Sequence, residues 1–252
     1  MAAPLIFALE PKNTPSQHLL QTSLSFSPQP LHFSSYRDLY GNRIWRVMAD
    51  QGSLRLRHES ITEVSPNPDA VHHRLRKVPV QDLPNAVLHY TLPSRYCPSD
   101  LLTTTAWERF GGFEDGWPQV QAVCDWLHEN VRYQAGSGSG TSALEALERG
   151  EAVCRDFAHL GVSFCRALSL PARYVSGYLP EIGVTPDGLP MDFHAWFEVY
   201  LGSGWHTFDA RHNTPRTGRV VVAKGRDAAD VAFSTTYGAT RLETLEVWAE
   251  AL

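Results

Sequence analysis

The chain lacks several features that would place it in other functional classes. Its 252 residues carry 22 Lys and Arg against 27 Asp and Glu, so there is no basic excess for binding nucleic acid. No stretch approaches the ~20 consecutive apolar residues of a membrane-spanning helix. No basic residue precedes the short apolar run near the start, as a secretory signal would require. We therefore expect a cytoplasmic protein that binds neither nucleic acid nor a membrane.

Motifs for metals, nucleotides and serine chemistry are also missing. No two of the four cysteines are spaced as C-x-x-C, and neither H-E-x-x-H nor G-x-S-x-G occurs. The glycine-serine run from Gly136 to Gly140 lacks the lysine of a phosphate loop and the spacing of a dinucleotide fingerprint. The sequence thus predicts no cofactor. It leaves open whether the run is a lid or an inert linker.

The N-terminal quarter of the chain is typical of a small antiparallel β domain. Leu20, Thr22, Leu24 and Phe26 alternate with their neighbours at a period of two. Further strands are expected over 43–49 and 53–63, whereas residues 1–17 show no clear strand. We assign residues 1–65 to this domain. Residues 66–100 contain six prolines and are expected to be an irregular connecting segment.

Residues 101–252 show alternating helix and strand signals. Helices are expected from Pro118 to about residue 131, from the capping box Ser142-x-x-Glu145 up to Gly150, and from 154 to 168, where Pro171 stops the third. Strands are expected over 173–178, 194–201 and 205–209, the last two joined as a hairpin through residues 202–204. The fold class is therefore α+β.

Cys154 is the candidate nucleophile, because it stands at the start of a predicted helix. Free N–H groups and the positive helix end stabilise a thiolate there, and the thiolate is the reactive form. The same N–H groups can stabilise an oxyanion. Cys124 and Cys165 lie on apolar helix faces and are interpreted as core residues, and Cys97 has no evident partner.

His194 is the candidate base and Asp209 the candidate group that orients it. His194, Trp196 and Glu198 share one face of their strand. If Tyr200 pairs with Trp205, Asp209 falls diagonal to His194 on that face. If the loop is residues 202–204 alone, Asp209 points away. The triad requires the first register or an aspartate just beyond the strand. The other histidines, among them His206 and His212, are interpreted as solvated or structural.

Several segments resemble the bacterial transglutaminase-like superfamily, in the family's order. They are 152–160 (AVCRDFAHL), 170–178 (LPARYVSGY), 192–200 (DFHAWFEVY), 205–209 (WHTFD) and 225–231 (GRDAADV), with 36–43 (YRDLYGNR) in the upstream β domain. The resemblance implies an N-terminal β region followed by a papain-like α+β catalytic core, here residues 101–252. It also implies a catalytic triad of Cys154, His194 and Asp209.

The implied chemistry is attack of the Cys154 thiolate on an amide carbonyl to give a thioester. His194 would move the proton and Asp209 would hold the imidazole ring. Animal transglutaminases bind calcium, but no acidic calcium-loop pattern occurs here, so no metal is expected. Tyr133 lies where transglutaminases place an aromatic that hydrogen-bonds the oxyanion. A tyrosine that only ends a helix is the alternative interpretation for it.

Two positions depart from the family pattern. Ala152 and Ser169 stand where the family usually has glycine, and either residue would be strained at a positive φ. We favour a peptidase or amidase acting on a peptide or protein amide. The alternatives are an amide-forming acyltransferase or transglutaminase, and a peptide-binding module without turnover. The substrate, the acyl acceptor and the oligomeric state are left open by the sequence.

Overall fold

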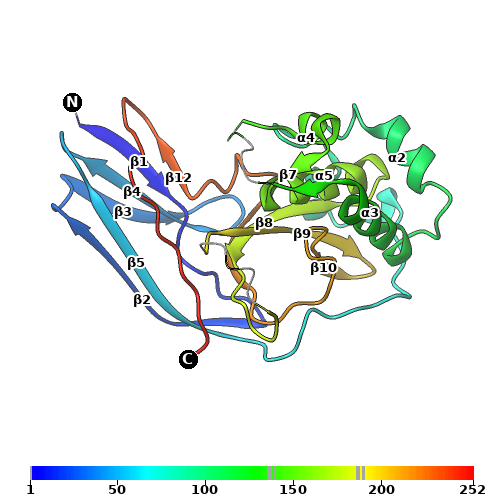
Figure 1. Ribbon diagram of the computed structural model, residues 1–252, viewed down its shortest axis with the longest axis horizontal. Helices are drawn as coiled ribbons and strands as arrows, with labels where there is room; N and C mark the ends of the chain where they lie inside the picture. Colours follow the sequence, from blue (N-terminus) through cyan, green and yellow to red (C-terminus); the bar gives the residue numbers. More distant parts are fainter. Residues whose placement is uncertain (1, 135–137, 139, 186–187, 189–190) are drawn as a thin grey trace.

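The structure is a computed structural model that describes residues 2–134, 138, 140–185, 188 and 191–252. It places antiparallel β sheets at one end and a mixed helix and sheet layer at the other (Figure 1). The fold is thus α+β, as the sequence predicts. The run from Gly136 to Gly140 lies largely outside the described residues, so its role as a lid or linker is not addressed by the structure.

The first strand of the N-terminal sheet was not expected from the sequence. β1 (Ala3–Phe7) lies between β12 (Ser234–Thr236) and β4 (Arg43–Ala49), with β3 (His32–Arg37) at the far edge. Both faces of β1 are covered, because Leu5 packs toward Phe26 and Val47 whereas Ile6 packs against the core of the C-terminal part. Its apolar residues therefore run without alternation, which hides the strand from a period-two search.

A long two-stranded ribbon extends from the same region. β2 (Gln17–Ser27) pairs antiparallel with β5 (Arg55–Val64), and the register shifts between Leu19 and Gln21. The expected alternation holds at Leu24 and Phe26 but is wrong at Leu20, whose side chain is 64% exposed. A β-bulge inserts one residue and so reverses which side chains face inward.

The connecting segment contains only short helical turns. These are η1 (Val80–Asp82), α1 (Asn85–Leu88) and η2 (His89–Thr91). The segment then leads into α2 (Thr103–Phe110), and the C-terminal strand β12 returns to pair with β1. The N-terminal sheet is thus completed by residues from the far end of the chain.

The three predicted helices of the C-terminal part are present. α3 (Trp117–Asn130) has Pro118 in its first turn, and α4 (Ala143–Arg149) has the Ser142–Glu145 capping box and ends at Gly150 in a left-handed conformation. α5 (Cys154–Ala167) ends before the expected proline stop, because Ser169 adopts φ 58° and Leu170 N–H donates to Cys165 O at 2.8 Å. This is a Schellman motif at the C-terminus of α5, and glycine is the usual residue at the position that Ser169 occupies.

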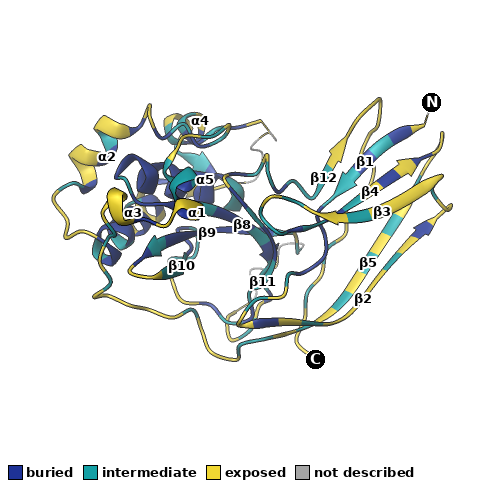
Figure 2. Ribbon diagram, turned by 180° about the vertical axis from the view of Figure 1, so that it is seen from behind, coloured by how far each residue is buried: buried dark blue, intermediate teal, exposed yellow. Residues whose placement is uncertain are grey.

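The sheet of the C-terminal part has the order β10–β9–β8–β11. Its strands are β8 (Ala172–Tyr178), β9 (His194–Leu201), β10 (Gly204–Phe208) and β11 (Val220–Gly225), all antiparallel. Helix α5 packs across β9 at the centre of the buried region (Figure 2). Gly161 permits this approach, because a Cβ there would lie 2.4 Å from Phe197 Cε1. The helix that begins with Cys154 therefore packs directly against the strand that begins with His194.

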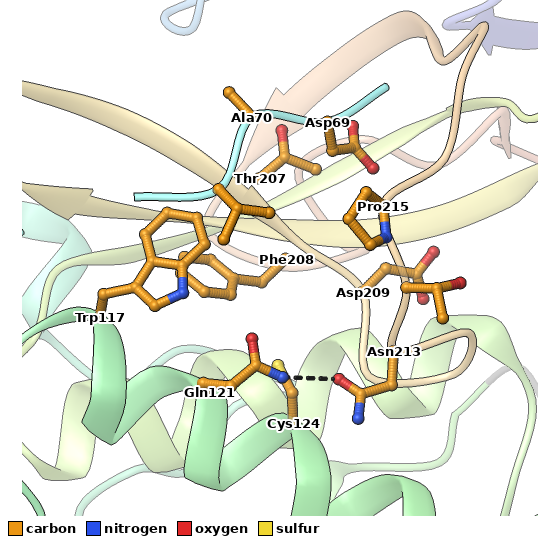
Figure 3. Close-up of a pocket in the computed structure, with 12 residues that line it drawn as sticks. Asp69, Ala70, Trp117, Gln121, Cys124, Thr207, Phe208, Asp209, Asn213 and Pro215 are labelled. Carbon is orange, nitrogen blue, oxygen red and sulfur yellow. Dashed lines mark hydrogen bonds between the residues drawn. The ribbon is translucent and has the colours of Figure 1, made fainter. Parts of the chain in front are cut away.

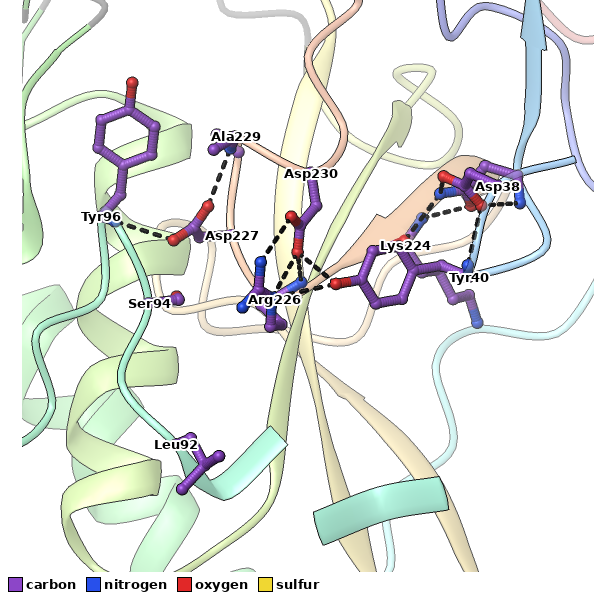
Figure 4. A network of polar contacts seen from close by, with 12 residues as sticks. Asp38, Tyr40, Leu92, Ser94, Tyr96, Lys224, Arg226, Asp227, Ala229 and Asp230 are labelled. Atoms are coloured by element: carbon purple, nitrogen blue, oxygen red, sulfur yellow. Dashed lines mark hydrogen bonds and ion pairs between the residues drawn. The ribbon is translucent and has the colours of Figure 1, made fainter. Parts of the chain in front are cut away.

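The β-domain turn at residues 36–43 is bonded to the segment at residues 224–230 (Figure 4). Asn42, fully buried, donates to Lys224 O at 2.9 Å and accepts from Lys224 N–H at 2.9 Å. Tyr40 donates its hydroxyl to Asp230 Oδ2 at 2.8 Å, and Asp230 also pairs with Arg226. These hydrogen bonds therefore connect the N-terminal sheet to the sheet that contains β11.

Within the part of the chain that the structure describes, no helix combines the length and apolarity needed to cross a bilayer.

Candidate active site

Cys154 is the first residue of α5 and is partly accessible. Asp156, fully buried, accepts a hydrogen bond from Val153 N–H at 3.2 Å and thereby closes the helix start. Arg155 pairs with Asp156 at 3.1 Å in the first turn of the helix. Ala152 lies in β7 (Glu151–Ala152), and its φ is not among the positive values of the described residues, so alanine at this position brings no strain.

The β9–β10 hairpin decides where Asp209 points. Tyr200 pairs with Trp205, which is the register that the triad requires. Leu201 and Gly204 also pair, so the turn is the two residues Gly202 and Ser203, one residue shorter than the connection 202–204 expected from the sequence. Asp209 follows the last residue of β10 and falls on the face of His194.

The three candidate residues meet. His194 Nε2 lies 2.8 Å from Asp209 Oδ2, and both side chains are buried. The Cys154 thiol lies close enough to the His194 imidazole for that ring to lower the pKa of the thiol, and Nδ1 is the ring nitrogen that is not paired with Asp209. Cys154 Sγ is also 3.8 Å from Phe193 O. The imidazole of His194 thus lies between the thiol of Cys154 and the carboxylate of Asp209.

The charges of the site favour a thiolate and an imidazolium. Burial would raise the pKa of the Cys154 thiol, but the hydrogen bond and charge of His194 outweigh it and lower that pKa. Burial would likewise lower the pKa of His194, yet the Asp209 carboxylate raises it. Burial opposes the charge of Asp209 too, and His194 and then Arg219 hold the pKa of Asp209 far below its usual range. A low thiol pKa makes the reactive form available near neutral pH.

Two residues near Asp209 were missed by the sequence interpretation. His212 was expected to be solvated or structural. Its ring centroid lies 5.2 Å from that of His194, and its backbone N–H donates to Asp209 Oδ1 at 3.3 Å. Burial lowers the pKa of His212 to about 4. Arg219 Nη2 lies 3.0 Å from Asp209 Oδ2. No sequence motif marks either residue, since both follow Asp209 in an irregular loop or at its end.

One group of side chains has the spacing of a metal site. His194, Asp209 and His212 each offer a ligand atom within 4.8 Å of the others. Arg219 pairs with Asp209, however, and Arg216 Nη1 lies 3.3 Å from His212 Nδ1. Cationic guanidinium groups disfavour a second cation, and the His194–Asp209 bond already occupies those atoms. We assign no metal to this group.

Tyr133 lies beside the nucleophile segment. It is part of β6 (Arg132–Tyr133), where it pairs with Ala152 in a parallel bridge. Its ring is 40% exposed and is covered by the Arg211 guanidinium at 3.7 Å. Tyr133 is therefore in the expected neighbourhood, stacked against an arginine. A role toward an oxyanion stays a prediction.

The remaining cysteines and Trp196 have core environments. Cys97, Cys124 and Cys165 are free and buried, and burial raises the pKa of each thiol, that of Cys97 to about 12. Trp196 is 1% exposed and stacks with His194 at a centroid distance of 6.1 Å. Cys154 is thus the thiol whose surroundings favour ionisation.

The chain matches two family models. Residues 107–210 match the transglutaminase-like superfamily core, and residues 2–65 match the bacterial transglutaminase-like N-terminal region. Cys154, His194 and Asp209 all lie in the first match, whereas Arg219 lies outside both.

Two kinds of relative are found. The crystal structure of a Cytophaga hutchinsonii protein named "Putative Cysteine Protease" is 34% identical, with a TM-score of 0.85, covering 99% of this chain and 89% of that one. An uncharacterized protein of Mycobacterium leprae is 33% identical over 147 residues, 56% of this chain and 51% of its own length. An uncharacterized protein of Mycobacterium tuberculosis is 28% identical over 249 residues, covering 88% of this chain and 77% of its own. The chain thus spans about half the length of the M. leprae protein. With both family matches and a whole-length structural relative, this chain belongs to the transglutaminase-like superfamily.

Proposed function

We propose that this protein is a cysteine-dependent peptidase or amidase that acts through a thioester on Cys154. The observation that carries the proposal is the contact series from the Cys154 thiol through His194 to Asp209 Oδ2, with the thiol pKa lowered and the imidazole pKa raised. A buried ion pair of this kind is suited to nucleophilic attack on a carbonyl carbon. The name of the Cytophaga relative supports the peptidase direction.

The first half-reaction transfers the acyl group to sulfur. The Cys154 thiolate attacks the amide carbonyl carbon, and the oxygen takes the negative charge. The backbone N–H of Cys154 precedes the first hydrogen bond of α5, which runs from Asp156 N–H to Val153 O, and is suited to stabilise that oxygen. The C–N bond then breaks as the His194 imidazolium gives its proton to the leaving amine. An acyl thioester and a neutral imidazole result.

The second half-reaction releases the acid. His194, now neutral, takes a proton from water as the water oxygen attacks the thioester carbonyl. The C–S bond breaks, which restores the thiolate and the imidazolium. Asp209 keeps the ring oriented through Nε2 in both steps and stabilises its positive charge. A primary amine attacking in place of water would give an amide, the transglutaminase outcome.

The test is to capture the intermediate and follow its fate. The full chain is incubated with a library of peptide amides, quenched in acid and digested, and the acyl mass on each cysteine is measured. We expect an acyl adduct on Cys154 and free acid as the product, both absent in Cys154→Ser and retained in Cys124→Ala. Adding a primary amine reports the partition. A predominantly amide product would favour acyl transfer, and no adduct with any amide would contradict the proposed enzyme.

A further inference from the structure

The carboxylate of Asp209 contacts other groups besides the imidazole of His194. Oδ1 accepts a hydrogen bond from the backbone N–H of Arg211 at 3.1 Å, and Oδ2 pairs with His194 Nε2 at 2.8 Å. Arg219 Nη2 lies 3.0 Å from Oδ2 in an ion pair without hydrogen-bond geometry. The side chains of Arg219 and Asp209 are 7% and 3% exposed, so water scarcely screens the pair. Arg219 is therefore the arginine whose side chain pairs with the carboxylate of Asp209.

Arg219 is itself held by the connecting segment. Its Nε lies 2.8 Å from Asp69 Oδ2 and 3.1 Å from Asp69 Oδ1. Asp69 also accepts from Arg216 N–H at 2.9 Å and donates its own N–H to Arg216 O at 3.0 Å. Asp69 and Asp209 line one small pocket between α3 and the loop after β10 (Figure 3). The Arg219 guanidinium further lies 5.0 Å from the centre of the Trp196 ring.

We propose that Arg219, anchored by Asp69, is a positioning residue that fixes the Asp209 carboxylate toward His194 and so maintains the reactive thiolate of Cys154. The guanidinium is a rigid planar cation that is hydrogen-bonded to Asp69 through Nε and paired by charge with Asp209 through Nη2. This inference rests on the proposed function and adds residues from outside both matched family regions.

Two effects of Arg219 on the site oppose each other. Its positive charge repels the His194 imidazolium, so its removal would favour the ion pair by charge alone. Its hold on Oδ2 keeps the hydrogen bond that stabilises the imidazolium, so its removal would weaken the ion pair by geometry. The positioning role requires that the second effect is the larger, and this sets the sign of the test.

The other groups around the triad do not obscure the measurement. They are Cys124 and Asp125 on α3, Arg155 and Asp156 on α5, Tyr174 on β8, and Arg211, His212 and Arg216 in the loop after β10. Burial lowers the pKa of His212 to about 4 and raises the pKa of Cys124 and of Tyr174 above their usual values. A titration between pH 5 and 9 therefore reports the Cys154–His194 pair.

The experiment measures the rate of Cys154 alkylation by iodoacetamide from pH 5 to 9, read by peptide mass spectrometry, which needs no substrate. We expect Arg219→Gln to raise the midpoint by about one pH unit, equal to about tenfold slower labelling below the midpoint. Asp69→Asn, which keeps the arginine charge and loses its anchor, should shift the midpoint the same way by less. If Arg219→Gln does not fold, Asp69→Asn decides alone.

The matched control is Arg173→Gln. Arg173 is also a well-covered arginine paired with a buried acid, since its Nε donates to Glu198 Oε2 at 2.6 Å on the same strand as His194. Loss of the Arg173 guanidinium should lower the free energy of unfolding and leave the pH midpoint of Cys154 alkylation unchanged. A midpoint that is unchanged or lowered in the Arg219 and Asp69 variants overturns the positioning role while the proposed function stands. An ordinary midpoint in the unaltered protein overturns both.

Discussion

His194 Nε2 lies 2.8 Å from Asp209 Oδ2, although His194 begins β9 and Asp209 directly follows β10. The contact exists because Tyr200 pairs with Trp205, which places residue 209 on the face of residue 194. A one-residue slip would turn the carboxylate to the other face. The contact between His194 and Asp209 therefore depends on the register of the hairpin.

His194→Ala should abolish the low thiol pKa. Without the imidazole, burial alone acts on Cys154, and burial raises the pKa of a thiol. We expect the midpoint of Cys154 alkylation to move from below ~8.5 to above it. His206→Ala is the control, since His206 is a half-buried histidine on β10 outside the triad. Equal midpoints in the two variants would contradict a thiolate–imidazolium pair.

The sign of the pH dependence follows from the two shifts. The depressed Cys154 pKa makes the thiolate persist as pH falls, until that lowered pKa is reached. The raised His194 pKa keeps the imidazolium protonated as pH rises, until that raised pKa is reached. Amide hydrolysis should therefore have a bell-shaped pH profile bounded by these two apparent values. A steady rise in rate through pH 9, measured as kcat/KM, would contradict it.

Ser169→Gly should stabilise the protein. Ser169 has φ 58° at the closure of α5, a conformation that costs an L-residue roughly 1–2 kcal/mol and glycine little. The greater conformational entropy of glycine in the unfolded chain offsets part of this gain. We therefore expect the free energy of unfolding, measured in urea, to rise by about 0.5 kcal/mol. Gly150→Ala is the reverse case, because Gly150 has φ 66° and open space around its Cβ position. It should destabilise through backbone strain alone, and a gain in stability there would refute the argument.

Gly161→Ala should disrupt the seating of α5 on β9. The added methyl group would lie 2.4 Å from Phe197 Cε1, so either the ring or the helix must move. Overpacking of this kind costs about 1–3 kcal/mol. Because Cys154 and His194 begin these two elements, slower Cys154 alkylation should accompany the loss in urea stability. Gly112→Ala is the control, since nothing lies within 4 Å of its Cβ position. Equal stability of the two variants would be inconsistent with this packing.

Asn42→Ala should weaken the attachment of the N-terminal sheet. Asn42 makes four side-chain bonds at 2.8–2.9 Å, to Lys12, Asp38 and both backbone groups of Lys224. Loss of the amide leaves buried donors and acceptors unpaired, at about 1–3 kcal/mol each. We expect a lower denaturation midpoint and faster proteolysis near residues 36–43. Asn67→Ala, at an exposed position, should show neither change.

Local patterns in the sequence determined much of the fold and the identity of the central site residues. The Pro118 helix start, the Ser142–Glu145 capping box and the strand 194–201 depend on neighbours in the chain, so local propensity identifies them. The placement of Cys154 at a helix start followed in the same way. Strand alternation and hairpin register made His194 and Asp209 candidates, and the family's spaced motifs strengthened the choice of His194 among eleven histidines.

Tertiary structure decided what depends on residues far apart in the chain. β1 is hidden in the sequence because both of its faces are buried, and β12 reaches it from more than 200 residues away. The bulge that exposes Leu20 and the two-residue turn that orients Asp209 are choices of register between strands. Asp69, Arg219 and His212 gather around Asp209 from an irregular segment and a loop. Their convergence arises from chain packing and electrostatics, which no periodic pattern encodes.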